Sequence, residues 1–190
     1  MKSKTPETIK TPVGTIEWAH LLQPDTKYKE AGEYKLDLLV DEDAAQPVID
    51  AISAKYDEYY ADQLKETGKP KLKRASLPWE ANDGVVKFKF RVKAVINTKK
   101  GPWDRKPNVT RPDGNEVICR VGNGSEGKVA FELYFWNTAL GLGVTLQPRF
   151  VRITKLVQHK SPSDISPFDN EEEAPRAAAK TGTDDEEITW

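Results

Sequence analysis

The segment Val85–Ile96 (VVKFKFRVKAVI) constrains the fold most strongly, because its side chains alternate strictly from Val86 onwards. Period-two alternation over this length predicts a β-strand with one buried face. Like charges two residues apart on one strand face repel each other. The strand is therefore either an edge strand protected by lysines or part of a surface that meets a polyanion. The apolar face comprises Val86, Phe88, Phe90, Val92, Ala94 and Ile96, and the opposite face Lys87, Lys89, Arg91 and Lys93.

The charge around this strand favours a polyanion-binding surface. Between Lys69 and Arg111, thirteen Lys and Arg residues stand against three acids, a local net charge of +10. Trp79 and Trp103 lie in the same segment. Cations interleaved with aromatic rings suit single-stranded nucleic acid, because cations follow the phosphates and rings stack on unpaired bases.

The net charge of −1 for the whole chain hides an uneven distribution. From Ser166 to the end the net charge is −6, whereas residues 1–165 carry +5. Apolar residues also become rare after Lys160. We therefore expect a folded domain over residues 1–160 and a disordered acidic tail over residues 161–190. The end of the tail suggests a docking motif for a partner, formed by Asp184, Asp185, Glu186, Glu187, Ile188 and Trp190.

The rest of the chain is mainly β, with further strands expected over residues 11–22, 33–40, 115–121, 128–136 and 143–157. Gly14 is a candidate bulge, and the last strand should bend near Pro148. Residues 69–82 and 97–114 are expected to be loops. Five or six strands with one early helix are compatible with a small barrel such as the OB-fold, or with a sandwich. Periodicity alone does not choose between them.

A helix is predicted after the second of these strands. Asp43 with Gln46 fits a capping box at its start, and Gly68 should end it. Apolar residues recur at helical spacing between these points, including Tyr56, Tyr59 and Tyr60. Tyrosines at this spacing indicate core packing rather than base stacking.

One glycine-rich stretch imitates a nucleotide-binding motif. Gly122–Lys128 (GNGSEGK) contains G-x-G-x-x-G and nearly matches the Walker A pattern. Both patterns need a helix directly after the glycines, because the helix N-terminus helps to bind phosphate. A strand is predicted there instead, so we expect a hairpin turn.

No catalytic or metal-binding constellation is found in the sequence. Cys119 is the single cysteine, and His20 and His159 are far apart, which argues against disulfides and zinc. We therefore expect a non-enzymatic protein without a cofactor or metal. The chain has no apolar run long enough to span a bilayer and no apolar region typical of a signal peptide, so we expect it in the cytoplasm.

The run Lys128–Gln147 (KVAFELYFWNTALGLGVTLQ) resembles the single-stranded DNA-binding proteins of tailed bacteriophages. Its most specific part is YFWNTALG, residues 134–141. The resemblance extends in the same order over residues 33–38, the helix that follows, the basic loop 71–74 and residues 87–90. The family resembled is an OB-fold group whose acidic C-terminal tail ends in an aromatic residue. The end of this chain, Ile188-Thr189-Trp190, departs from the family's acid followed directly by phenylalanine.

The resemblance implies a five-stranded OB-fold barrel with one helix between its second and third strands. It also implies a protein that coats single-stranded DNA in phage replication, recombination and repair, in the host cytoplasm. The tail would recruit the phage DNA polymerase and helicase and would compete with DNA for the binding groove. Self-association is compatible with the sequence.

The expected DNA-binding surface combines the cationic strand face with nearby loops and aromatic rings. Tyr34 and Trp79 are further stacking candidates, and Trp136 is equally explained as a residue that holds a turn. Two alternatives stay open: an RNA-binding OB-fold chaperone and an accessory subunit of a nuclease or recombinase. The expected binding residues are Lys71, Lys73, Arg74, Lys87, Lys89, Arg91, Lys93, Lys99, Lys100, Trp103, Arg105, Tyr134 and Trp136.

Overall fold

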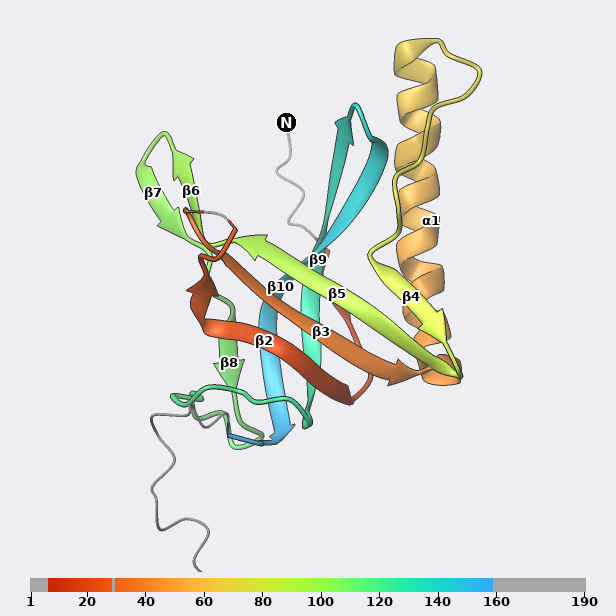
Figure 1. Ribbon diagram of the computed structural model, residues 1–190. Helices are drawn as coiled ribbons and strands as arrows, with labels where there is room; N and C mark the ends of the chain where they lie inside the picture. The colour runs from red at the N-terminus through yellow and green to blue at the C-terminus, as the bar shows by residue number, and fades with distance from the viewer. Residues whose placement is uncertain (1–6, 29, 159–190) are drawn as a thin grey trace, which may run out of the picture. The chain divides into compact units, whose positions relative to one another are not determined.

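The computed structural model describes residues 7–28 and 30–158, which form a mainly β structure with one helix. The expected acidic tail and its six candidate docking residues, 184–188 and 190, lie outside the described residues. The elements are shown in Figure 1. They are β1 (Ile9–Lys10), β2 (Gly14–Asp25), β3 (Glu33–Asp41), α1 (Glu42–Thr67), β4 (Trp79–Asn82), β5 (Val85–Lys93), β6 (Val95–Thr98), β7 (Gly101–Asp104), β8 (Asn108–Thr110), β9 (Ser125–Thr138) and β10 (Gly141–Lys155).

The long strands pair in a closed circuit. β2 pairs with β3, and β3 with β5, both antiparallel. β5 runs parallel to β10, which pairs antiparallel with β9, and β9 returns to pair antiparallel with β2. β1, β4 and β8 extend this sheet, whereas β6 and β7 form a separate hairpin. The helix comes between the second and third strands of the circuit, counted along the chain.

The interior of the circuit is filled by the apolar faces predicted from alternation. On β5, Val86, Phe88, Phe90 and Val92 are buried, as predicted. The strand nevertheless ends at Lys93 and does not continue to residue 96. The N–H of Ala94 still donates to the Gly32 carbonyl next to β3, but its carbonyl accepts from the Arg105 N–H after β7 and so leaves the ladder. The chain then enters the β6–β7 hairpin.

The predicted helix is present, but its N-terminal cap is different. Asp41, not Asp43, caps the helix, and its carboxylate accepts a hydrogen bond from the Asp43 N–H. Gln46 donates to Asp50 instead of closing a capping box. The acid that ends β3 already occupies the cap position, so Asp43 becomes part of the first turn. The end is as predicted, because Gly68 adopts a left-handed conformation and donates to the Leu64 carbonyl.

The tyrosines of α1 pack against the sheet, as predicted. Tyr56 is buried, and its hydroxyl donates to the Leu142 carbonyl at 2.7 Å. The ring of Tyr59 stacks on Phe135 of β9 with 4.8 Å between centroids. Tyr60 is partly buried against the same core. The helix is therefore attached to β9 and β10 by its aromatic face.

Several expected loops and turns are wrong in detail. Residues 69–82 contain β4, and residues 97–114 contain β7, β8 and the end of β6. Segment 115–121 holds two isolated bridges, at Glu116 and Val121, rather than the expected strand. The motif at 122–128 does contain a turn, in which the Ser125 N–H donates to the Gly122 carbonyl, and the strand predicted after it is present as β9. The turn is not that of a hairpin, because Val121 before it pairs with Gln158 and not with β9. Gly14 begins β2 and is not a bulge; the register slips further along, between Glu17 and His20.

Candidate nucleic-acid interface

Three aromatic and two arginine side chains lie on β9, on β10 and on or directly after the β6–β7 hairpin. Alternation along β9 buries Val129 and Phe131 and turns Tyr134 outward. The hairpin, which projects from the sheet in Figure 1, carries Trp103 on β7. We call this group the aromatic–arginine cluster; it comprises Trp103, Arg105, Tyr134, Trp136 and Arg149.

The two guanidinium groups of the cluster share one indole ring. The Cζ atoms of Arg105 and Arg149 each lie 5.6 Å from the centroid of Trp103, within the range of a cation–π contact. Arg105 also donates to Gln147 at 2.7 Å, and Arg149 forms an ion pair with Glu132 at 3.2 Å. These contacts fix both cations while 48% of the Trp103 surface stays exposed.

The cluster holds more positive than negative charge. Burial, followed by the charge of Arg149, lowers the pKa of the Arg105 guanidinium, and Glu132 and Tyr134 oppose this shift. The buried Nε of Arg105 has no hydrogen-bond partner among the residues that the structure describes. An unpaired buried donor destabilises a fold, so a ligand oxygen that accepts from it would be bound favourably. Two arginines with one carboxylate form a site suited to an anion.

The two aromatic residues of β9 differ in how much of the ring is free. Tyr134 is 55% exposed, whereas Trp136 is partly buried. The indole N–H of Trp136 donates to Thr145 at 3.0 Å, and the ring lies over Gly143, its cross-strand partner. Trp136 therefore packs on the β9–β10 hairpin, and Tyr134 offers the freer ring.

Sequence reasoning missed Arg149, Gln147 and Phe150 in this region. The register of β10 against β9 shifts between Pro148 and Phe150. A bulge interrupts alternation, so Phe150 is 57% exposed. Phe150 and Arg149 line a hollow that Trp103 also lines. The bend predicted near Pro148 could have indicated these three residues, because a bulge at a bend redirects the neighbouring side chains.

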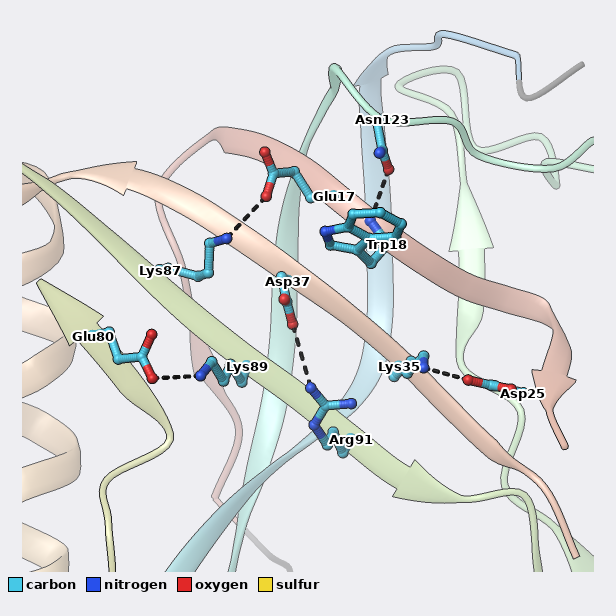
Figure 2. Close-up of polar contacts among 10 residues, drawn as sticks. All are labelled: Glu17, Trp18, Asp25, Lys35, Asp37, Glu80, Lys87, Lys89, Arg91 and Asn123. Carbon is cyan, nitrogen blue, oxygen red and sulfur yellow. Dashed lines mark hydrogen bonds and ion pairs between the residues drawn. The ribbon is translucent and has the colours of Figure 1, made fainter. Parts of the chain in front are cut away.

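The cationic face of β5 is compensated by acids from neighbouring strands. Figure 2 shows three ion pairs: Lys87 with Glu17, Lys89 with Glu80 and Arg91 with Asp37. Their nitrogen–oxygen distances are 3.1, 2.5 and 3.7 Å, respectively. The hydrogen bond from Lys87 to Glu17 raises the pKa of Lys87, and that from Lys89 lowers the pKa of Glu80. Lys93 lies opposite Glu33 in register. The face therefore mixes both signs, contrary to the uniform charge that β5 alone suggests.

A fourth ion pair extends this mixed surface towards the end of β2. Lys35 pairs with Asp25. The side-chain hydrogen bond from Lys35 and the backbone N–H of Lys27 lower the pKa of Asp25 to about 2. The carboxylate consequently stays charged at any pH where the protein would meet nucleic acid.

The loop cations fall outside the cluster. Arg74 pairs with Asp57 of α1 at 2.9 Å and stacks on Tyr60 at 4.2 Å, so it fastens its loop to the helix. The other four are exposed: Lys71 and Lys73 in the loop after α1, and Lys99 and Lys100 at the tip of the β6–β7 hairpin.

The two additional stacking candidates are not free rings. Tyr34 is 4% exposed and its hydroxyl reaches Asp104, so the expectation that it stacks on a base is wrong. Trp79 packs against the core, 6.5 Å from the Phe88 centroid. Alternation along β3 turns Tyr34 towards the interior. The pairing of β4 with β5 does the same for Trp79.

Metal ligands and membrane-spanning helices are the two remaining features that bear on function. Among residues 7–28 and 30–158, no three His, Cys, Asp or Glu side chains are grouped as metal ligands. No helix within those ranges has the length and apolar character needed to cross a membrane.

Known proteins resemble this chain over most of its length. A family model described as "Single-stranded DNA-binding protein, Bacteriophage T7" matches residues 13–156. The single-stranded DNA-binding protein of Enterobacteria phage T3 is 27% identical, over 94% of this chain and 88% of the relative. That of Escherichia phage T7 is 31% identical, over 76% of this chain and 74% of the relative.

Solved structures are similar as well. The crystal structure of gp2.5, a single-stranded DNA-binding protein encoded by bacteriophage T7, has a TM-score of 0.72 and 28% identity, covering 92% of this chain and 100% of that one. The single-stranded DNA-binding protein of bacteriophage Enc34, solved in complex with single-stranded DNA, has a TM-score of 0.60. At 13% identity, over 85% of this chain and 100% of that one, the second likeness concerns the fold.

Proposed function

Because the chain belongs to the single-stranded DNA-binding protein family of bacteriophage T7, we propose that it coats single-stranded DNA during phage replication, recombination and repair. The observation that carries this proposal is the aromatic–arginine cluster, in which exposed rings and two guanidinium groups share one surface. Rings can stack on any base, and guanidinium groups can follow the phosphates, so such a surface binds with little sequence preference.

We further propose that the closed circuit of five strands is an OB-fold barrel. The order β2–β3–β5–β10–β9 with return to β2, and the helix between its second and third strands, support this assignment. OB-folds present the outer face of their strands and adjoining loops to oligonucleotides. The cluster and the mixed-charge face of β5 both lie on that outer face.

The proposed binding mode uses the cluster as the centre and the other cations as its surroundings. Arg105 and Arg149 contact phosphates while Trp103 and Tyr134 stack on bases. Each cation of β5 is now paired with a carboxylate, and it contacts DNA when a phosphate replaces that carboxylate. Breaking the ion pair costs little free energy, because exposed ion pairs contribute about 0–1 kcal/mol. Lys71, Lys73, Lys99 and Lys100 add electrostatic attraction at the margins.

Fluorescence titration tests the proposed function directly. Matched single-stranded DNA, double-stranded DNA and RNA oligomers should be compared at several salt concentrations. Tight binding to single-stranded DNA with weaker binding to the duplex supports the proposal. A clear preference for RNA would favour the RNA-chaperone alternative, and equal binding to the duplex would contradict a role for exposed rings.

Binding to single-stranded DNA should weaken steeply as salt rises. Each phosphate contact on a single strand contributes a slope of roughly −0.7 in a plot of log affinity against log salt. Contacts from the two cluster arginines and four loop lysines would give a slope of about −4. A slope near zero in the titrations would contradict an electrostatic interface.

Deleting residues 166–190 should tighten DNA binding at low salt. The deleted segment carries a net charge of −6 beside a body of +5. A flexible chain of 25 residues reaches about 25–30 Å, enough to bring its acids to a nearby basic surface at high effective concentration. The gain in affinity should shrink as salt screens this attraction.

A tail with its final acids neutralised is the matched control for the deletion. Changing Asp184 and Asp185 to Asn, and Glu186 and Glu187 to Gln, should reproduce part of the gain without shortening the chain.

We also propose that the tail recruits the phage DNA polymerase and helicase, so the deletion should abolish their capture. Equal DNA affinity of the full-length and truncated proteins at low salt would contradict competition, and unchanged capture would contradict recruitment.

A further inference from the structure

Between Glu17 and His20, strand β2 contains one residue more than the facing part of β3. Ile16 and Leu21 are both buried although they are five positions apart, and strict period two would place them on opposite faces. The register against β3 slips between Glu17 and His20. Trp18 lies within this slip and has a φ of 51°, in the left-handed region. It is the extra residue of a β-bulge.

A tryptophan in this conformation is unusual and has to be held there. Left-handed backbone is uncommon outside glycine, and for a bulky residue it is an outlier that concentrates at functional sites. The loop before β9 supplies the support. The Trp18 N–H donates to the Asn123 side chain at 2.8 Å, and the Gly124 N–H donates to the Ile16 carbonyl at 3.0 Å.

The bulge directs the indole ring into solvent. Trp18 is 64% exposed, and Figure 2 shows its ring beside Asn123 on the side of the sheet that carries the ion pairs. Core packing therefore does not explain the residue. A large exposed aromatic ring on a fixed, strained backbone suggests a ligand that stacks on it.

A hollow of about 250 Å³ adjoins the ring and is lined in part by polar side chains. It is smaller than the 300–1,000 Å³ of a site for a drug-sized ligand, so it suits part of one nucleotide. His20, Gln23, Arg120 and Asn123 contribute to its wall. Arg120 donates to the neutral side chain of Gln23 at 2.9 Å and forms no ion pair with any acid of the described residues. The hollow thus combines a ring with a cation that has no acidic partner among the described residues.

We propose that Trp18 and Arg120 form a separate nucleotide subsite, in which the indole stacks on one base and the guanidinium contacts a phosphate of the same strand. The proposal rests on the proposed function, because its ligand is single-stranded nucleic acid. The guanidinium of Arg120 and the amide side chain of Asn123 favour this ligand over a protein partner. For a protein partner, Ile118, which is 84% exposed and precedes Arg120 by two residues, would offer an apolar contact.

The strand register connects this subsite to the aromatic–arginine cluster. His20 on β2 lies opposite Lys35 on β3, and Lys35 lies opposite Arg91 on β5. β5 pairs with β10, which carries Gln147, the hydrogen-bond partner of Arg105. Crossing from β2 to β10 takes three strand spacings of about 4.8 Å, roughly 14 Å in total. One bound strand that crosses the sheet therefore meets both sites.

Trp18→Gly is the sharpest test, because glycine adopts the left-handed conformation without strain. The variant should keep or raise the thermal unfolding temperature and should weaken binding to single-stranded DNA roughly 5- to 150-fold, the loss of one stacked base. Trp18→Asn, which also tolerates this conformation, provides a second variant. Arg120→Gln should weaken binding and make the log–log salt slope less steep by about 0.7.

Ile118→Ala is the matched control, since it removes an exposed apolar side chain next to the subsite and should leave DNA affinity unchanged. Each variant is also compared with wild type by sedimentation. Reduced self-association of Trp18→Gly and Ile118→Ala, with unchanged DNA affinity, would assign the surface to protein contact and overturn the proposal. Unfolding of both Trp18 variants would show a structural role and overturn it too.

Failure of this proposal can be told apart from failure of the proposed function. Wild-type protein that does not bind single-stranded DNA contradicts the proposed function itself. Wild-type binding that is weakened by Trp103→Ala, but unchanged by Trp18→Gly and Arg120→Gln, overturns the subsite alone.

Discussion

Replacing Trp103 by alanine should weaken binding to single-stranded DNA by about 1–3 kcal/mol, and replacing Tyr134 should do the same, because each loses one stacked base. Trp103 is 48% exposed and Tyr134 is 55% exposed, so neither ring is needed to fill the core. The double variant should lose roughly 2–6 kcal/mol if the two rings hold different bases. A smaller loss would mean that both rings contact one base, because neighbouring sites are not additive.

The measurement is fluorescence or anisotropy titration with one oligomer at fixed salt, accompanied by thermal unfolding. Leu140→Ala is a suitable control, because Leu140 is 69% exposed in the β9–β10 turn and carries neither a ring nor a charge. Trp136→Ala is less informative, since that ring also packs over Gly143 and bonds Thr145. Loss of folding in Trp103→Ala without a specific binding defect would show that the ring belongs to the core.

Replacing Gly14 or Gly127 by alanine should destabilise the fold by about 3 kcal/mol, at the upper end of the usual range for overpacking. The two glycines face each other where β9 returns to β2 and closes the circuit of strands. A Cβ at Gly14 would lie 2.4 Å from the Leu39 carbonyl oxygen, and one at Gly127 would lie 2.6 Å from that of Arg152. Paired backbone cannot move aside as a flexible side chain can, so the strands must separate.

Thermal unfolding should register each change as a fall of roughly 6–12 °C for a domain of this size. Gly114→Ala separates steric crowding from backbone strain. Gly114 has a φ of 86°, but among the described residues no atom outside its two chain neighbours lies within 4 Å of the position that a Cβ would take there. This variant should therefore lose only about 1 kcal/mol, the strain of the left-handed conformation. Equal effects at Gly14 and Gly114 would contradict a close approach of strands at the closure.

Local periodicity was sufficient to predict the elements that form the core. Alternation in β5 correctly identified its buried face, including Phe88 and Phe90. Helical spacing correctly placed the tyrosines of α1 against the sheet, and Gly68 marked its end. These features depend on neighbours a few residues away, so the information is contained in short stretches of sequence.

Composition and local motifs also indicated the kind of ligand. The YFWNTALG run and the basic segment pointed to a phage single-stranded DNA-binding protein, and the family match over residues 13–156 confirms that membership. Trp103, Arg105, Tyr134 and Trp136 were all named from sequence; Arg105 contacts Trp103, and Tyr134 and Trp136 share one face of β9. The DNA-binding roles of these residues remain predictions.

Tertiary pairing decided which of the cations are free. Lys87 has no acid beside it on its own strand, but Glu17 lies 70 positions away in sequence and 3.1 Å away in space. Likewise Arg149 and Trp18 reach the surface because β10 and β2 change register at bulges. A bulge depends on the pairing of two strands, and an ion pair on which strands become neighbours. Both follow from the closure of the whole sheet, which no single stretch of residues encodes.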